Sequence, residues 1–579
     1  MKPALHLAVI FAVILLTACS FSRKPVPQPV VSPPLELSQH CDEVIGAPQV
    51  EELAPGVWIA RGYDLANTIL IASDEGHVII DAGMSPARAQ PVREALLAEA
   101  PGSIRAVVYT HSHIDHIGGA SVWLEEGTEI WATESFVEHV VKQYGRFQRA
   151  EAARGRRQFG MHVPEASLPC SAIGARVDIH AALESGFRMP THTFSGTARL
   201  EVGGRSIELV EAHGETHDQL FVWLPEERVL MPGDNYYHTF PNLYTIRGTA
   251  PRPIDSWIRS LDQMRAYEPE VLAPAHTYPV RGSEEIQRRL RDYRDAIQWI
   301  RDDVVRLATA GKGIEEIVAS VRLPAHLAEQ PYLAELYGQV DWSVRAIYSN
   351  ELGWFDGDAV GLYTHPATET ARREVLAMGG ATTVFEQAVS ARATGDPRWA
   401  VHLLAKVRSS GLPVEGRSIN EELAAALRDT AADVTNTNGR AYLLESAHEL
   451  IHGATRSSAA TFDDPLLAGV PLYTIFDVMS GRLFAQSALD VHESVVWNFP
   501  ETGERFVMTI RNGVAELVVG DALPGTPEPL AVVTADPMTW RRLATQSQNP
   551  LTALASGGLR IEGSQLGFLR FVNRFDRDF

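Results

Sequence analysis

Four potential metal ligands fall within one short segment of the chain, and these are His111, His113, Asp115 and His116. The preceding residues 104–109 are apolar and rich in β-branched side chains, which predicts a buried strand. The loop leaving that strand would present the first two histidines on one side. Imidazole and carboxylate at this spacing suit zinc or a similar divalent ion. We therefore expect one ion on the two histidines and a second on the Asp–His pair, just before a helix opened by Gly118 and Gly119.

Three further candidates each follow an apolar, strand-like run, and these are Glu215, Asp234 and His276. Glu215 lies in a glycine turn between His213 and His217, which are the alternatives for its position. Single acids and histidines are more often structural than functional. Their occurrence at successive strand ends downstream of the first cluster favours a two-metal hydrolase.

Length and charge limit the classes of protein to consider. A chain of 579 residues exceeds one hydrophobic core, so two to four domains are expected. The formal net charge of −21 disfavours a nucleic-acid partner, because phosphates would be repelled. An anionic substrate would need a local positive site, supplied by metal ions or by a placed arginine.

The N-terminus predicts export and lipidation. Lys2 precedes an apolar run over residues 5–16, which is too short to span a bilayer, and the run leads to Leu-Thr-Ala-Cys19. Residues 1–19 resemble a bacterial lipoprotein signal peptide, with Cys19 as the lipidated residue; an ordinary signal peptide is the alternative. Residues 20–40 form a proline-rich tether. We expect a periplasmic lipoprotein in the bacterial cell envelope, anchored to the outer membrane through Cys19.

Two cysteines remain in the mature chain, Cys41 and Cys170. An even pair in an oxidising compartment permits one disulfide. Two buried free thiols would be compatible with the same sequence, so the pairing stays open at this level.

The rest of the chain divides into three sections by periodicity. Residues 41–282 alternate short apolar strands with helical stretches, which indicates a layered α/β domain; within it, residues 139–193 form a long insertion that could act as a lid. Residues 283–452 have helical spacing and no catalytic cluster, which favours an interface or scaffold. Residues 457–579 return to short strands, with a predicted hairpin turn at residues 511–513.

The chain resembles the metallo-β-lactamase superfamily, whose H-x-H-x-D-H motif is matched by residues 111–116 and whose early buried aspartate is matched by Asp81. Glu215 stands where most members have histidine, and this feature is similar to the alkyl sulfatase branch. Residues 242–248, Asn-Leu-Tyr-Thr-Ile-Arg-Gly, resemble that branch's N-L-x-T-[LI]-R-G segment. Residues 352–357 are similar to its helical dimerisation domain, and segments around Trp497, 502–504 and 559–563 to its sterol-carrier-like domain.

This resemblance implies an architecture and a metal centre. The expected fold is an αββα metallo-β-lactamase sandwich over 41–282, an all-α dimerisation domain over 283–452 and an α+β sterol-carrier-like domain over 457–579. Two divalent ions, expected to be zinc, would be held in one case by His111, His113 and Glu215 and in the other by Asp115, His116 and His276. Asp234 would bridge them, in a position where the branch usually has glutamate.

The implied activity is hydrolysis of alkyl sulfate esters to alcohol and sulfate by a metal-bound hydroxide, which Asp115 could orient. Asn242 and Arg247 would bind the sulfate, since a guanidinium matches two of its oxygens. Gly361 stands where some members have a histidine near the site, and Phe159 where they have a tyrosine. Because sulfate is a weakly basic leaving group, attack at carbon is modestly favoured.

The alternatives are another hydrolase of the superfamily, acting on a lactone, thioester, β-lactam or phosphoester, and a non-catalytic lipid-binding lipoprotein. We expect a homodimer formed through the helical section.

Overall fold

A computed structural model of the chain describes residues 28–143, 145, 147–178, 185–454 and 463–576. The predicted signal peptide and Cys19 lie outside these residues. Within the described ranges, no helix combines the length and the apolar character needed to cross a bilayer.

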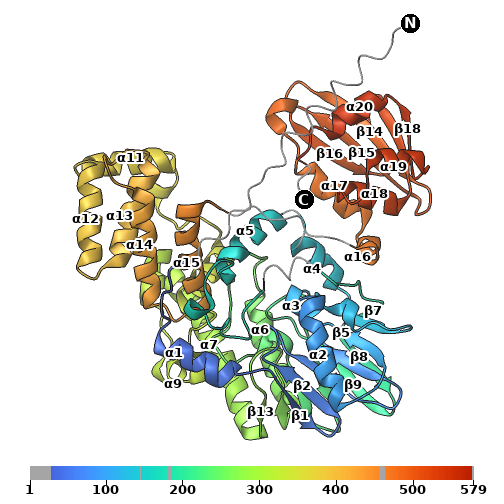
Figure 1. Cartoon of the computed structure of the whole chain (residues 1–579), viewed down its shortest axis with the longest axis horizontal. Helices are drawn as coiled ribbons and strands as arrows, with labels where there is room; N and C mark the ends of the chain where they lie inside the picture. Colours follow the sequence, from blue (N-terminus) through green and yellow to red (C-terminus); the bar gives the residue numbers. More distant parts are fainter. Residues whose placement is uncertain (1–27, 144, 146, 179–184, 455–462, 577–579) are drawn as a thin grey trace.

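Two β-sheets face each other in the N-terminal half (Figure 1). The first sheet has seven strands in sequence order: β1 (Gln49–Ala54), β2 (Val57–Arg61), β3 (Thr68–Ile71), β4 (His77–Ile80), β5 (Ile104–Val108), β6 (Glu129–Thr133) and β7 (His192–Phe194). Neighbours from β1 to β4 pair antiparallel, and those from β4 to β7 pair parallel. The second sheet, in spatial order, contains β13 (Val280–Arg281), β12 (Val271–Leu272), β11 (Val229–Met231), β10 (Leu220–Leu224), β9 (Arg205–Glu211) and β8 (Thr197–Val202).

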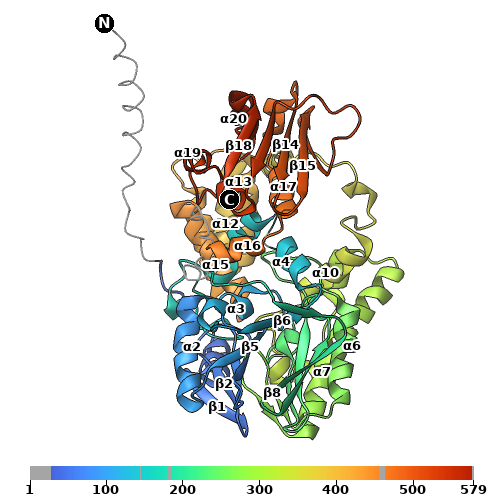
Figure 2. The same ribbon diagram turned by 90° about the vertical axis from the view of Figure 1, so that its right-hand side faces the viewer.

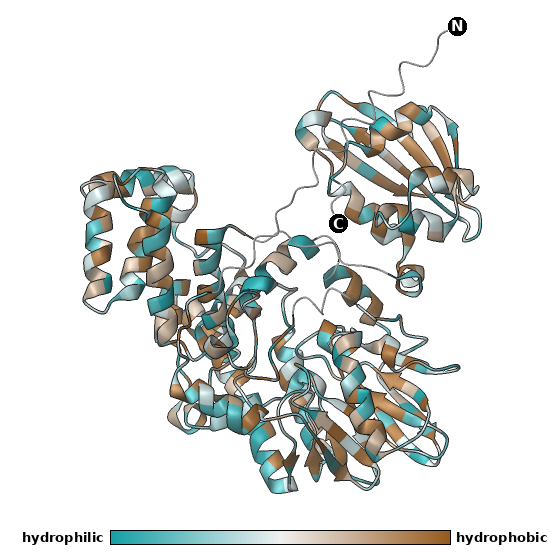
Figure 3. Ribbon diagram, in the orientation of Figure 1, coloured by the Kyte–Doolittle hydropathy of each residue, from teal (hydrophilic) through white to brown (hydrophobic). Residues whose placement is uncertain are grey.

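Apolar side chains from both sheets form one continuous core between them. Ile59, Ile71 and Val108 of the first sheet belong to the same buried cluster as Leu209 and Val222 of the second. Because both faces of the central strands are covered, these strands are apolar throughout rather than alternating. The strands in Figure 3 are accordingly coloured largely as hydrophobic.

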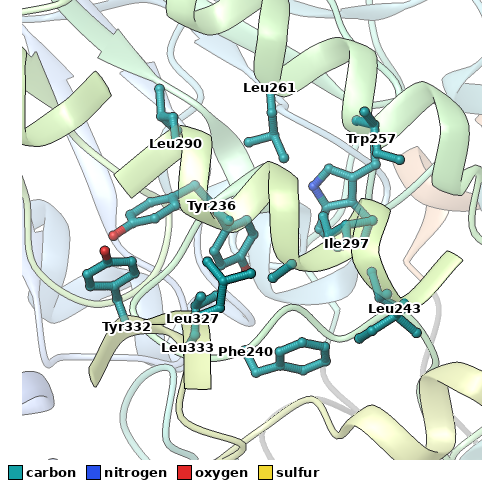
Figure 4. Close-up of a cluster of buried hydrophobic side chains, with 14 of the residues drawn as sticks. Tyr236, Phe240, Leu243, Trp257, Leu261, Leu290, Ile297, Leu327, Tyr332 and Leu333 are labelled. Atoms are coloured by element: carbon teal, nitrogen blue, oxygen red, sulfur yellow. The ribbon is translucent and has the colours of Figure 1, made fainter. Parts of the chain in front are cut away.

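Helices cover the outer face of each sheet, so the domain has four layers (Figure 2). Helix α2 (Pro86–Glu99) lies on the first sheet, where Val92 and Leu96 pack with Ile79 and Val107. Helices α6 (Ile254–Ala266) and α7 (Ser283–Thr309) lie on the second. Figure 4 shows part of the core they enclose, including Trp257, Leu261 and Leu290. The predicted αββα sandwich is confirmed.

The predicted boundaries after residues 282 and 452 stay predictions. Helix α7, which begins at the first of them, shares a buried cluster with Leu230 and Leu272 of the second sheet. That cluster also includes residues of α8 (Ile314–Ser320), α9 (Ala325–Ala328) and α10 (Val340–Leu352).

A second set of helices forms its own core. It contains α11 (Ala367–Ala377), α12 (Ala381–Ala393), α13 (Pro397–Ser410), α14 (Ile419–Ala432) and α15 (Thr437–His452). The insertion over residues 139–193, predicted as a lid segment, begins within α4 (Phe136–Gln143) and contains α5 (Gln148–Phe159), which packs against α15. The all-α section predicted from helical periodicity is confirmed.

The C-terminal section folds around a five-stranded sheet. Its spatial order is β16 (Val514–Val519), β15 (Glu504–Arg511), β14 (His492–Phe499), β17 (Ala531–Ala535) and β18 (Leu559–Gly563). Helices α16 (Asp464–Gly469), α17 (Leu472–Ser480), α18 (Pro537–Ala544), α19 (Pro550–Ala555) and α20 (Gln565–Val572) complete this section. Asn512 and Gly513 have φ of 49° and 75°, which is the backbone that a tight hairpin turn requires. The predicted α+β domain and its hairpin are therefore confirmed.

A disulfide joins Cys41 to Cys170, with Cα atoms 5.7 Å apart and a sequence separation of 129. Cys41 follows the first helix, α1 (Leu35–His40), and Cys170 lies in the lid segment. The pairing left open by the sequence is thus formed in the structure.

Candidate dinuclear metal site

The seven predicted ligands all lie in the connections that leave strands of the two sheets. The loops after β5, β9, β11 and β12 supply them. They fall into two groups in which potential ligand atoms lie within 4.8 Å of one another, and every member is buried. One group is His111, His113, Glu215 and Asp234, and the other is Asp115, His116 and His276.

The helix expected to open at Gly118 and Gly119 is a single 3-10 turn over Ala120–Val122, with Gly119 as its N-cap, and a further short helix precedes the glycines. Helix α3 spans Ile114–Ile117 and carries Asp115 and His116 itself. The two glycines instead allow a close approach to the loop after β4. A Cβ on Gly118 would lie 1.9 Å from the Met84 carbonyl oxygen, and one on Gly119 would lie 2.3 Å from that of Ala82.

Asp234 lies between the two groups. Its Oδ2 is 3.1 Å from His276 Nε2 and 3.7 Å from His111 Nε2, and its Oδ1 is 3.4 Å from His116 Nε2. Asp115 Oδ2 lies 3.4 Å from His116 Nε2 and 3.6 Å from His276 Nε2. Asp234 thus contacts ligand atoms of both groups, as a bridging carboxylate would.

Hydrogen bonds fix the tautomers of three histidines. His116 Nδ1 donates to Asp81 Oδ2 over 2.8 Å, and His276 Nδ1 donates to the Leu65 carbonyl oxygen over 2.8 Å. His111 Nδ1 donates over 3.1 Å to Thr110 Oγ1, which in turn donates to Asp81. In each ring Nε2 therefore faces the cluster, where His111 Nε2 lies 2.8 Å from His113 Nδ1 and His276 Nε2 lies 3.1 Å from Asp234 Oδ2, and it is the atom that a metal ion would use. Asp81, which accepts from both His116 and Thr110, has a left-handed backbone conformation with φ of 60°.

Buried atoms without partners show that the cluster suits a cation. Within the described part of the chain, His116 Nε2, Asp234 Oδ1 and Glu215 Oε2 have no hydrogen-bond partner. Burying such atoms costs free energy unless a ligand satisfies them. The donor set of imidazoles and carboxylates matches divalent ions such as zinc.

Burial and neighbouring charges shift the pKa values of the cluster. Burial, together with the nearby charge of His116, lowers the pKa of His111 to about 3, so its ring is neutral at neutral pH. Burial raises the pKa of Glu215 to about 8, against the opposing effect of Arg252. A neutral imidazole is the form that binds metal.

Glu215 is held by two residues outside the motif. Its backbone N–H donates to Asn235 Oδ1 over 3.0 Å, and its Oε1 accepts from Arg252 Nη1. His213 Nε2 pairs with Glu211 at 2.7 Å and His217 Nε2 with the Pro251 carbonyl at 3.0 Å, so both alternatives to Glu215 have other partners.

Asn242 and Arg247 both carry polar groups that remain available to a ligand. Asn242 is 1% exposed, and neither its Oδ1 nor its Nδ2 has a hydrogen-bond partner among the described residues. Arg247 is anchored by its backbone N–H on Gln158 Oε1 and by Nη1 on Thr245 Oγ1. Within the described ranges, its guanidinium forms no ion pair, and its charge opposes the effect of burial on the pKa of Glu151. Burial and the charge of His111, and then the charge of Arg247, lower the pKa of His113 in the first ligand group.

Phe159 and Gly361, the two departures from the family pattern, lie in different surroundings. Phe159 directly follows Gln158 at the end of α5, so it is close to the Arg247 segment. Gly361 lies in a short turn after α10, where the single described heavy atom within 4 Å of an added Cβ is Asp356 Oδ1. Nothing described around Gly361 in this chain belongs to the metal-ligand cluster.

Sequence reasoning missed Arg252, Gln158 and Asn235. Arg252 and Gln158 are distant in sequence from the residues they contact, and no motif marks them. Asn235 adjoins Asp234 and could have been selected by that proximity alone.

Comparison with known proteins assigns this site to a class. Residues 61–276 match the family model of the metallo-beta-lactamase superfamily. Residues 313–453 match the alkyl sulfatase dimerisation family, and residues 460–579 match the alkyl sulfatase C-terminal family.

Full-length relatives narrow the class further. The chain is 31% identical over 528 residues to a linear primary-alkylsulfatase of Pseudomonas sp. (strain ATCC 19151), covering 88% of this chain and 98% of the relative. It is 29% identical to an (R)-specific secondary-alkylsulfatase of Pseudomonas sp., covering 91% and 81%. The solved structure of the stereoselective inverting sec-alkylsulfatase Pisa1 from Pseudomonas sp. superposes with a TM-score of 0.82 at 26% identity, covering 96% and 88%. The chain belongs to the alkylsulfatase family of metallo-β-lactamase-fold enzymes, as its motifs predicted.

Proposed function

We propose that this protein hydrolyses alkyl sulfate esters to an alcohol and sulfate. The observation that carries the proposal is a buried set of seven metal-ligand candidates together with an arginine that forms no described ion pair and whose charge helps to lower the pKa of the ligand candidate His113, and a buried amide without described partners. The names of its relatives, which are primary and secondary alkylsulfatases, support the same substrate class.

The two ligand groups would hold two zinc ions. His111, His113 and Glu215 would bind one ion, Asp115, His116 and His276 the other, and Asp234 would bridge them. Bound ions supply Lewis acidity and lower the pKa of water near the substrate. Elemental analysis of the purified protein should find close to two zinc ions per chain, and in His111→Ala close to one; a single ion in the active unsubstituted protein would contradict the assignment.

Arg247 and Asn242 would bind the sulfate group. A guanidinium presents parallel N–H donors to two sulfate oxygens, and the Asn242 Nδ2 adds a neutral donor that no described residue satisfies. Thr245 and Gln158 hold Arg247 in place, so little conformational entropy would be lost on binding.

We infer that the C–O bond of the ester is the bond that breaks. Sulfate is a stable leaving anion that needs no proton, whereas cleavage of the S–O bond would release an alkoxide that needs one. The Pisa1 relative is described as inverting, which requires attack at carbon in that enzyme. Hydrolysis in oxygen-18-labelled water should therefore label the alcohol, and label found in the sulfate would overturn the assignment.

The substrate class is tested with a panel. Sulfate release from alkyl sulfates of short, medium and long chains should exceed turnover of lactones, thioesters, β-lactams and phosphoesters at equal concentration. Loss of activity on all alkyl sulfates in the His111→Ala variant would tie the turnover to this site. Faster turnover of any of the other classes would replace the proposal.

We also propose a homodimer and a lipid anchor. The segment matched by the dimerisation family contains exposed apolar side chains, including Trp354, Val360 and Tyr363, that a second copy could cover. Light scattering should find twice the chain mass.

The lipobox-like run before Cys19 supports a periplasmic lipoprotein, and Cys19→Ala should abolish incorporation of labelled fatty acid into the expressed protein.

A further inference from the structure

A buried ion pair joins Arg252 to the metal-ligand candidate Glu215. Arg252 Nη1 donates to Glu215 Oε1, and the two side chains are only 3% and 4% exposed. The remaining carboxylate oxygen, Oε2, has no hydrogen-bond partner among the described residues. Arg252 therefore occupies one oxygen of the carboxylate and leaves the other for a metal ion.

Charge counting shows why such a partner matters here. As the family resemblance indicates, most members of the wider metallo-β-lactamase superfamily have a neutral histidine in the turn that carries Glu215 here. A glutamate that binds a metal ion as its carboxylate adds one negative charge to a cluster that already holds Asp115 and Asp234. Like charges at close range in a buried site repel one another, and the guanidinium cancels the added charge. Counted together, Glu215 and Arg252 carry the same net charge as a neutral histidine.

The position of Arg252 is rigid. Pro251 and Pro253 flank it, and proline restricts both its own backbone and that of the residue before it. Helix α6 begins immediately afterwards at Ile254, and its Ser260 Oγ donates to the His213 carbonyl of the glutamate turn over 2.7 Å. The segment carrying the arginine and the turn carrying the glutamate are thus tied together.

We propose that Arg252 is a positioning residue that makes Glu215 equivalent to a histidine ligand, so that the two residues act as one unit toward the first metal ion. This inference rests on the proposed metal centre but not on the identity of the substrate. It differs from a role in sulfate binding, which Arg247 is placed to perform. It predicts that the effect of removing the arginine depends on which residue occupies position 215.

The test is a double-mutant cycle on zinc affinity. The full-length unsubstituted protein, Arg252→Met, Glu215→His and the double variant are stripped of metal and titrated with zinc against a chromophoric chelator. Circular dichroism and thermal unfolding establish that each variant is folded. The second ligand group, Asp115, His116 and His276, serves as an internal reference in every variant. Arg259→Met, an exposed arginine on α6, is the matched control and should leave both affinities unchanged.

The expected results have opposite signs in the two backgrounds. With Glu215 present, Arg252→Met should weaken the first ion about 10–100-fold, the usual effect of losing the partner of a metal ligand. In the Glu215→His variant, a retained Arg252 would lie as an unpaired cation near the ion. In that background Arg252→Met should strengthen zinc binding by about tenfold, since like charges at close range repel.

Two outcomes would overturn the proposal. One is an equal effect of Arg252→Met in both backgrounds, and the other is full zinc affinity in the single variant Arg252→Met. Should the methionine variants fail to fold, Arg252→Lys replaces them, because lysine keeps the positive charge. Zinc affinity at the first site should then be largely retained when Glu215 is present. It should remain low in the Glu215→His background. Since the readout is zinc binding, failure here is distinct from failure of the alkyl sulfate assay.

Discussion

Arg247 is held in place by hydrogen bonds, and its guanidinium forms no ion pair among the described residues. Gln158 and Thr245 hold it, and its charge opposes the burial that raises the pKa of Glu151. An arginine in this state is already oriented by the fold, so an incoming anion gains the full charge-assisted contact.

Arg247→Ala should leave both metal ions bound and lower kcat/KM for alkyl sulfates by about two to three powers of ten. Lysine should restore little, because an ammonium cannot reproduce two parallel hydrogen bonds. Steady-state kinetics with parallel elemental analysis measure both quantities. A metal-replete variant with unsubstituted rates would make Arg247 structural.

At the scale of single residues, the sequence predicts the ligand candidates well, but it does not predict the residues that hold the site residues in place. The histidines and Asp115 lie within one motif, and Glu215, Asp234 and His276 follow recognisable strands. Arg252 and Gln158 were missed because their roles arise from contacts across long sequence separations, 37 residues for Arg252 with Glu215 and 89 for Gln158 with Arg247. Only the folded chain brings such pairs together.

Among the elements, α3 depends on the absence of a side chain at its end. Gly118 lies where a Cβ would be 1.9 Å from the Met84 carbonyl oxygen, an approach that backbone atoms cannot relieve locally. The sequence marked these glycines as a helix start because glycine often punctuates elements. Their close packing against the loop after β4 was not visible in any local pattern.

Gly118→Ala should therefore displace α3, destabilise the fold by about 1–3 kcal/mol and weaken zinc binding at the proposed site of Asp115 and His116. Thermal unfolding and zinc titration measure the two effects. Gly155→Ala is the matched control: this residue lies within α5, no described atom is within 4 Å of its added Cβ, and alanine favours helix. Equal stability of the two variants would contradict the packing argument.

The contact between α15 and the segment after α5 contains a group of histidines. His448 is stacked on His162 with ring centroids 4.6 Å apart, and the ring centroid of His452 lies 4.5 Å from that of His448. Burial lowers the pKa of His448 to about 4, and the charges of His162, His452 and Arg428 contribute in the same direction.

A histidine whose pKa is lower in the folded state than its ordinary 6.5 stabilises the fold above pH 6.5. This contribution is lost as the pH falls from 6.5 to about 4, because the unfolded chain takes up the proton first. His448→Gln should therefore lose less stability than the unsubstituted protein over that range. Unfolding temperatures across it provide the comparison, with the solvent-accessible His402→Gln as control; parallel curves for His448→Gln and the unsubstituted protein would refute it.

On the scale of the whole molecule, the C-terminal domain is joined to the catalytic domain by packing as well as by the chain. Leu466 of α16 belongs to the same buried cluster as Phe136 and Phe187 of the catalytic domain. The rest of the C-terminal section has its own core around Trp497. Exposed apolar side chains on α19 and α20, among them Leu551 and Leu566, could contact an alkyl tail.

Truncation after Gly469 keeps α16 in place and removes the remaining C-terminal domain. If that domain binds or delivers apolar tails, kcat/KM should fall more for long-chain than for short-chain sulfates. Rates across a series of chain lengths test this, with zinc content as the control for an intact site. Equal losses at every length would make the domain a structural support.

The three-part architecture could be predicted because each part has its own periodicity and its own motif. The placement of the parts could not, because it depends on side chains such as Leu466 that look like ordinary core residues. The disulfide also lay beyond sequence reasoning, since two cysteines permit a bond without requiring it.

The disulfide also determines how the protein would respond to mechanical load. Strand β1 is the edge strand of its sheet, and the chain enters it from the N-terminal side. Tension applied through an anchored N-terminus would otherwise peel β1 from β2, one hydrogen bond at a time. Because Cys41 precedes β1 and is bonded to Cys170, a pulling force would pass into the lid segment through a covalent bond before reaching the sheet. The reduced protein should therefore unzip from its N-terminus at a lower pulling force than the oxidised protein.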